Sequence, residues 1–248
     1  MPRRDPQLSL PLPAPRQWGG QRAGAGRKRT GKPASKPNLA HVSRAPFRKP
    51  LPAHVTLRLR TDTPSLRTVK VVHEIERTFA RGCVRPGFRL VHYSLQGNHA
   101  HLIVEAQDHA TLGRGMMAIG SRLVRAVHRI AERSGSVLAD RYHVRMLPTP
   151  KEVRNALRYV LLNARHHVAT ATARTRRTPR AVLPTPVRLD PASSARWFDG
   201  WKPGRSQEPG PHERPAVAHL RPVARARTWL LAVGWRRYGL LDPADVPG

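Results

Sequence analysis

Prolines are crowded toward the two ends of this 248-residue sequence and are nearly absent from its middle. Only Pro64 and Pro86 occur between residues 53 and 147. A proline lacks the backbone N–H and fixes φ, so helix and strand interiors avoid it. The distribution therefore predicts one folded centre with loosely structured ends. The predicted parts are a flexible basic arm (1–52), one folded domain (53–168) and a C-terminal extension of unknown role (169–248).

The charge balance favours a polyanionic partner. The chain has 45 basic and 15 acidic residues, a net charge of +30, and the excess is spread over the arm, the centre and the extension. Such an excess opposes compaction unless a polyanion neutralises it, and nucleic acid is the usual one. Most of the basic residues are arginines, which suits phosphate recognition but also fits a bias in the coding sequence.

The cysteine count and the apolar segments limit the expected cellular location and the possible metal chemistry. Cys83 is the only cysteine, which excludes a disulfide or a cysteine-based zinc site within one chain. The N-terminal apolar stretch is short and broken by proline, and no run approaches a membrane-spanning length. We therefore expect a cytoplasmic, nucleoid-associated protein without a membrane partner, as a monomer or a homodimer.

Hydrophobic periodicity predicts an α+β domain. Alternating residues indicate strands, and apolar residues at helical spacing indicate helices. The order β-α-β-β-α-β-α is typical of a ferredoxin-like or RRM-like split βαβ with an antiparallel sheet. The predicted strands are 54–60, 88–95, 99–106 and 141–147, with a hairpin turn at 96–98. The predicted helices are 65–82, 110–133 and a last one after Thr149, which has a capping box with Glu152.

Two residue pairs could carry chemistry. His99 and His101 lie two apart on a predicted strand, so both imidazoles project from one face, as bidentate capture of a divalent ion requires. Such spacing in a strand is also often incidental. Tyr159 and Asn163 are four apart on the last helix and share a face. A phenolate can attack phosphate when a metal polarises the phosphoryl oxygens, and an amide oxygen can bind a hard ion. An isolated tyrosine at the edge of a core would look the same.

Two sequence segments resemble a known family. The segment QGNHAHLIVE, with His99 and His101, resembles the histidine-hydrophobic-histidine motif of HUH endonucleases. The segment YVLLN, from Tyr159 to Asn163, resembles the tyrosine helix of the IS200-like and REP-associated tyrosine transposases. The resemblance covers about residues 53–168. It departs at Ala100, where the family often has a larger apolar residue, and after Asn163, where relatives commonly have proline.

The resemblance implies a metal-dependent, single-tyrosine DNA transposase. By this likeness His99, His101 and Asn163 bind Mg²⁺ or Mn²⁺, and Tyr159 attacks single-stranded or hairpin DNA to leave a 5′-phosphotyrosine. The arginine stripe of the helix 110–133 has no compensating acids, so it suits a phosphate track, although a solvated face is the commoner meaning. The expected DNA contacts are Arg27, Lys28, Arg29, Arg58, Arg122, Arg125, Arg129, Arg133 and Arg141.

Three alternatives remain open. The pairs His54/Thr56 and His92/Ser94 match the paired motifs of 2H-type RNA phosphoesterases, whose chemistry needs no divalent ion. An RRM-like sheet could bind single strands by stacking, mainly through Phe88, Tyr93 and Tyr142. A domesticated, catalytically silent descendant of a transposase would bind nucleic acid and not cut it. The aromatic segment Thr228–Leu241 in the extension could be a short helix that packs back on the core, with no assigned chemistry.

Overall fold

A five-stranded antiparallel sheet is the centre of the structure, a computed structural model that describes residues 47, 49–174, 187–203, 206–207 and 221–245. The strands lie in the order β2-β3-β4-β1-β5. They are β1 (Leu51–Arg58), β2 (Val84–Arg85), β3 (Phe88–Leu95), β4 (His99–Ala106) and β5 (His143–Met146). A separate parallel pair is formed by β6 (Val187–Arg188) and β7 (Ser206–Gln207).

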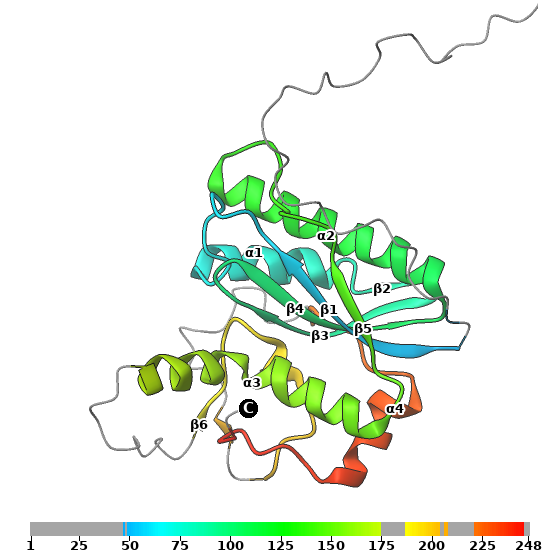
Figure 1. Cartoon of the computed structure of the whole chain (residues 1–248). Helices are drawn as coiled ribbons and strands as arrows, with labels where there is room; N and C mark the ends of the chain where they lie inside the picture. Colours follow the sequence, from blue (N-terminus) through cyan, green and yellow to red (C-terminus); the bar gives the residue numbers. More distant parts are fainter. Residues whose placement is uncertain (1–46, 48, 175–186, 204–205, 208–220, 246–248) are drawn as a thin grey trace, which may run out of the picture. The chain divides into compact units, whose positions relative to one another are not determined.

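The helices lie on both faces of this sheet. Figure 1 shows α1 and α2 against one face and α3 against the opposite face. The long helices are α1 (Val69–Ala80), α2 (His109–Ala131) and α3 (Pro150–Arg174). The extension adds the 3₁₀ turn η1 (Ser194–Trp197), the short helix α4 (Trp229–Ala232) and the 3₁₀ turn η3 (Gly234–Tyr238).

The strand order confirms the predicted α+β class. Without the two-residue β2, the chain runs β1-α1-β3-β4-α2-β5, and β1 lies between β4 and β5 in the sheet. This is the split βαβ arrangement, with α1 and α2 on the same side. Strands β3 and β4 have the predicted bounds, and the turn between them is closed by the Gln96 N–H, which donates to the His99 carbonyl at 2.8 Å. The short strand β2 was not predicted.

Two apolar cores lie on the two faces of the sheet. The larger one fills the space under α1 and α2, with Val55, Leu102 and Ile119 among its fully buried members. The smaller one packs α3 against the sheet through Val153 and Leu157. Since side chains alternate along a strand, the residues of β1 and β4 that do not enter the larger core face α3.

Described parts of the C-terminal extension pack on the sheet. Strand β2 pairs with only the first residues of β3, and the extension covers the rest of that edge. The Leu95 N–H donates to the Ala192 carbonyl at 2.8 Å, and Ala224 N–H donates to the Leu90 carbonyl at 2.8 Å. Covering an edge strand in this way satisfies its backbone groups and prevents pairing with another chain.

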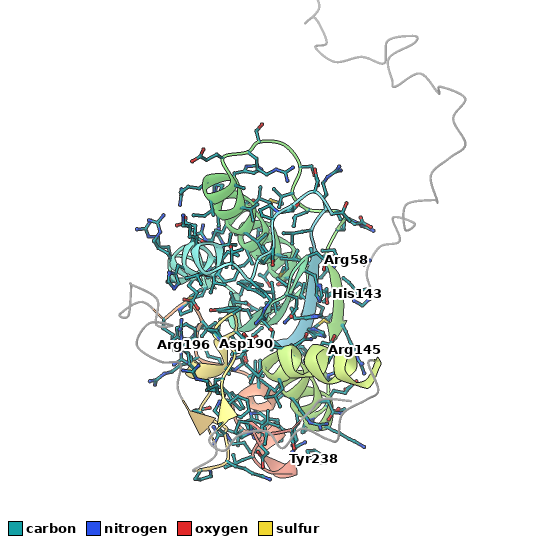
Figure 2. All side chains as sticks on the ribbon, turned by 90° about the vertical axis from the view of Figure 1, so that its left-hand side faces the viewer. Arg58, His143, Arg145, Asp190, Arg196 and Tyr238 are labelled. Atoms are coloured by element: carbon teal, nitrogen blue, oxygen red, sulfur yellow. The ribbon has the colours of Figure 1, made fainter. Side chains whose placement is uncertain are left out.

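Two ion pairs hold the same part of the extension in place. Figure 2 shows Asp190 and Arg196 in this part of the structure. Arg67 pairs with Asp190 at 2.8 Å, and Arg196 pairs with the buried Glu76 of α1 at 2.7 Å. The extension also buries Trp235 in the smaller core, which agrees with the interpretation that the segment 228–241 packs back on the folded centre.

The start of α3 follows its sequence signal. Thr149 Oγ1 accepts from the Glu152 N–H at 3.3 Å and donates to Glu152 Oε2 at 2.7 Å. Pro150 is the first helical residue, where its missing N–H costs nothing. The helix runs to Arg174, past the predicted domain boundary at 168. Among the described helices, none combines the length and apolar character needed to cross a membrane.

Candidate active site

Strand β4 places His99 and His101 on the face of the sheet that α3 covers. Both alternate with the buried Ala100 and Leu102, which face the larger core. In the antiparallel register His101 lies opposite Thr56 of β1, and His99 lies opposite Arg58. Directly opposite residues share a face, with Cβ atoms about 5 Å apart. The two histidines therefore share one face with a hydroxyl and a guanidinium.

The ring of His101 is held by two side chains of β1. Its Nδ1 lies 3.1 Å from His54 Nε2 and 3.2 Å from Thr56 Oγ1. Burial, together with the neighbouring charges of His143 and Arg145, lowers the pKa of His54 to about 4. His54 is therefore neutral at neutral pH and is able to accept from the Nδ1–H of His101. With Nδ1 engaged in this way, His101 would bind a cation through Nε2.

His99 has a partner of its own on the same ring atom. Asn98 Oδ1, in the hairpin turn, accepts from His99 Nδ1 at 2.9 Å. The rings of His99 and His101 are 4.8 Å apart between centroids, and they are nearly perpendicular. Metal-binding histidines usually have their second nitrogen fixed by such a neighbour, which sets the tautomer and the ring orientation. Both histidines of this pair have that arrangement.

Helix α3 brings Tyr159 to the histidine pair. The Tyr159 ring lies 5.1 Å from the His101 ring and 5.8 Å from the His54 ring, edge-on to both. The phase of the helix follows from its capping residue Thr149 and from the buried Val153 and Leu157, so Tyr159 projects toward the polar part of the sheet face. The structure thus brings the sequence-predicted His99, His101 and Tyr159 together.

Asn163 lies one turn after Tyr159 and is completely buried, with 0% of its surface exposed. Neither its Oδ1 nor its Nδ2 makes a hydrogen bond within the described part of the chain. A buried amide without partners costs about 1–3 kcal/mol, and native structures rarely retain one without a reason. An amide oxygen in this position, on the helix that carries Tyr159, fits the chemistry of a hard-cation ligand.

The candidate donors are the imidazoles of His99 and His101 and the amide of Asn163, one turn after Tyr159 on α3. In the residues that the structure describes, no group of three or more His, Cys, Asp or Glu side chains is arranged to hold a metal ion. A cation at this site would therefore depend on Asn163 and on groups outside the protein, such as water or phosphate oxygens. Mg²⁺ and Mn²⁺ keep open positions for such oxygens more readily than the closed structural zinc sites do.

Two of the four arginines in the α2 stripe are paired with acids, contrary to the sequence-based expectation. Arg129 forms an ion pair with Glu74 of α1, and Arg133 pairs with Asp62 at 3.2 Å. The expectation that these arginines lack compensating acids is wrong for Arg129 and Arg133, because the acids come from α1 and from the segment after β1. The stripe also belongs to the helix layer on the face of the sheet opposite to α3, as Figure 1 shows. It does not surround Tyr159.

The other expected DNA contacts lie in three places. Arg58 is exposed at the end of β1, opposite His99, and Figure 2 shows it on the same side as His143 and Arg145 of the edge strand β5. Arg141 is exposed just before that strand. Arg122 lies close to Gly82, and Arg125 is exposed on α2. Arg27, Lys28 and Arg29 lie outside the described residues.

The fold disfavours the phosphoesterase alternative, because the second histidine of its paired motifs, His92, is not accessible. His92 is buried, its Nδ1 lies 3.1 Å from Ser194 Oγ, and Phe198 packs edge-on against its ring. Ile103 lies between His54 and His92 in the register of the sheet. The two expected H-x-T/S motifs therefore do not meet at one open site.

The stacking-sheet alternative is disfavoured by burial. Phe88 and Tyr93 are 2% and 0% exposed and belong to the larger core, on the side of the helices α1 and α2. The opposite sheet face, which an RRM-like protein would use, is covered by α3 and by parts of the extension. Only Tyr142 keeps a partly accessible ring among the three expected platforms.

Comparisons with known proteins give two transposase structures with limited likeness. No family model matches the sequence, and no curated protein matches it. One solved structure is a REP-associated tyrosine transposase bound to a REP hairpin, at a TM-score of 0.42 and 15% identity, over 52% of this chain and 74% of that one. Another is a proposed transposase from Deinococcus radiodurans R1, at a TM-score of 0.34 and 12% identity, over 53% and 95% of the two chains. At these scores neither likeness carries an argument about activity.

Proposed function

We propose that the chain is a DNA transposase that cuts and rejoins a single strand through Tyr159, with a divalent cation held by His99, His101 and Asn163. The observation that carries the proposal is the convergence of the Tyr159 ring on His101, 5.1 Å away, from a different element of the fold. The motif resemblance of the segments around His99 and Tyr159 supports the same assignment.

The fit of the cation rests on two features of this chain. The Nδ1 atoms of His99 and His101 are both engaged by neighbours, so both rings are oriented to bind through Nε2. The buried carboxamide of Asn163 lacks a hydrogen-bond partner in the described part of the chain. A bound Mg²⁺ or Mn²⁺ would polarise the phosphoryl oxygens and stabilise the leaving 3′-oxygen.

The chain's own residues account for the group transfer. Tyr159 Oη attacks the phosphorus, a bond forms between them, and the bond from phosphorus to the 3′-oxygen breaks. The 5′-phosphate remains on Tyr159, and the 3′-oxygen leaves as a hydroxyl, so the phenolic proton lost by the tyrosine is balanced by the proton gained there. The energy of the phosphodiester is kept in the phosphotyrosine, and rejoining needs no nucleotide cofactor.

Arg58 is the cation best placed to hold the scissile strand. It lies opposite His99 on the same sheet face, and its side chain is exposed. A guanidinium binds a phosphate through two parallel hydrogen bonds, which fixes its orientation as well as its position. With Arg141 near the same sheet edge, we propose that a single strand, alone or continuing into a hairpin, reaches Tyr159 from the side of β5.

The decisive experiment is to trap the covalent intermediate. Wild-type protein incubated with Mn²⁺ and single-stranded DNA from its own genomic flanks should give a band that survives denaturation, with the labelled peptide containing Tyr159. Tyr159→Phe keeps the ring contact with His101 and deletes only the hydroxyl, so it should bind DNA and form no adduct. The matched control Tyr142→Phe should form the adduct as the wild type does.

Four results would reject the proposal. An adduct on Tyr142 or Tyr93 would move the nucleophile. Cleavage that persists in Tyr159→Phe, or that is unchanged by EDTA, would remove the tyrosine or the metal. Tight single-strand binding with no adduct under any divalent ion would identify the chain as a catalytically silent binding protein, the alternative that shares all these residues.

A further inference from the structure

The described end of the extension presents an exposed aromatic surface that the proposed active site does not use. Trp229 of α4 is 50% exposed and Tyr238 of η3 is 52% exposed, although both are large rings. Val233 lies between α4 and η3 and is exposed as well. We call Trp229, Val233, Arg237 and Tyr238 the Trp229 surface. Neighbouring rings such as Trp235 are buried, so exposure is a property of this face and not of the whole segment.

The Trp229 ring is fixed in place. A Cβ on Gly234 would lie 2.7 Å from the ring, so the indole lies directly against the glycine backbone. The Arg237 guanidinium lies 4.9 Å from the Trp229 ring centroid. Arg154 of α3 donates to the Gly239 carbonyl at 3.2 Å, which ties the end of η3 to the helix that carries Tyr159. The surface is therefore a fixed feature of the fold.

The sequence segment that forms this surface carries charge of one sign. Five arginines and no acid occur between residues 221 and 241: Arg221, Arg225, Arg227, Arg236 and Arg237. Arg236 pairs with Asp199 at 3.0 Å, and the acids that follow, Asp242 and Asp245, pair with Lys202 and Arg158 at 3.5 Å. In the described part of the chain no ion pair is formed by Arg237, whose guanidinium lies over the exposed indole.

We propose that the Trp229 surface binds single-stranded nucleic acid, with an unpaired base stacked on Trp229 and Arg237 and its phosphates held by the flanking arginines. Flat aromatic rings and guanidinium planes are the stacking platforms of single-strand binding, and a base inside a duplex cannot reach them. An apolar protein partner would have to desolvate the Arg237 guanidinium, which lies over the exposed indole. The site is distinct from that of Tyr159, and the inference does not depend on cleavage.

Binding of a labelled oligothymidylate of about 20 nucleotides to the full-length protein tests the proposal, with EDTA present so that no cleavage occurs. Trp229→Ala should weaken single-strand binding by about 10-fold, which is about 1.4 kcal/mol, while binding of a duplex of equal length stays unchanged. Trp229→Phe should retain most of the affinity, because a smaller ring still stacks. Arg237→Gln should lie between the two and should reduce the dependence of binding on salt.

The matched control is Met117→Ala, which removes another exposed apolar side chain, 72% exposed, from α2 on the opposite side of the sheet. It should bind as the wild type does. Unchanged single-strand affinity in Trp229→Ala, or equal losses for single strand and duplex, would overturn the proposal. The Tyr159 adduct should still form in Trp229→Ala at saturating DNA, so a failure of this inference is distinguishable from a failure of the proposed function.

Discussion

Asn163 is the residue at which stability and chemistry conflict most clearly. Its side chain is fully buried, and within the described residues its amide has no hydrogen-bond partner. Removing such a group from the interior normally stabilises a protein, because the desolvation cost of about 1–3 kcal/mol disappears. If the amide binds a cation, its function explains why the protein retains a destabilising group, as is common at active sites.

This conflict predicts opposite effects of one substitution. Asn163→Leu has a similar branched shape, so in metal-free buffer its free energy of unfolding should equal or exceed the wild-type value by about 1 kcal/mol. Mn²⁺ should raise the melting temperature of the wild type and not that of the variant, since only a folded-state ligand gives such a shift. Asn155→Leu, an exposed change on the same helix, should behave as the wild type. A retained Mn²⁺ shift in Asn163→Leu would disprove the ligand assignment.

The burial of the His92 imidazole predicts that the stability of the protein depends on pH. Burial lowers its pKa to about 3, whereas an unfolded histidine titrates near 6.5. Between these values the unfolded chain binds a proton that the folded chain does not, so the free energy of unfolding falls as the pH falls below 6.5. The loss from this group is about 1.4 kcal/mol per pH unit. From pH 6.5 to 5, urea unfolding should show about 2 kcal/mol more loss for wild type than for His92→Gln; equal slopes would contradict the burial of this ring.

At the scale of elements, the strands and helices with a clear local sequence pattern could be predicted. The strands 88–95 and 99–106 are rich in apolar residues and flank a short polar turn, and the last helix begins with a capping box and a proline at its first position. Because these elements have fixed phases, the face shared by His99 and His101 and the face shared by Tyr159 and Asn163 also followed from the sequence. That they meet required the sheet order, which the β-α-β-β-α-β-α pattern implies.

What escaped prediction depends on contacts between distant segments. The sequence offered His54 and Thr56 only as half of a phosphoesterase motif, and they reach His101 because β1 pairs with β4, which the local pattern of β1 does not reveal. Glu74 and Asp62 neutralise arginines of α2 from outside that helix. The extension has short aromatic segments and weak periodicity, so its role in covering β3 is visible only after folding.

The extension should therefore unfold together with the domain. Trp235 is 1% exposed, and its ring lies 5.4 Å from that of Phe198 in the core under α3. Trp235→Ala should lower the free energy of unfolding by about 3–5 kcal/mol in one cooperative transition. Trp229→Ala removes an exposed indole and should change stability by no more than about 0.5 kcal/mol. A separate early transition of the extension, with the main one unchanged, would contradict this packing.

At the scale of the whole molecule, the sheet separates two layers, one with ion-paired arginines and one with the candidate active site. In the layer of α1 and α2, Arg129 and Arg133 are bound to acids, and these ion pairs join α2 to α1 and to the segment after β1. The opposite face carries the candidate active site, with Arg58 beside His99. The net charge of +30 thus does not identify which arginines would contact DNA under the proposed function, and the ion pairs are the better guide.

Salt dependence of single-strand binding distinguishes these layers. Each phosphate neutralised by the protein contributes about 0.7 to the slope of the logarithm of affinity against the logarithm of salt concentration. Arg58→Gln with Arg141→Gln should therefore reduce the slope by about 1.4, because both side chains are exposed near the site. Arg129→Gln with Arg133→Gln should leave the slope unchanged and lower thermal stability, since it breaks the ion pairs to Glu74 and Asp62. The reverse result would return the α2 stripe to the DNA interface and would place the bound strand on the helix layer, across the sheet from Tyr159.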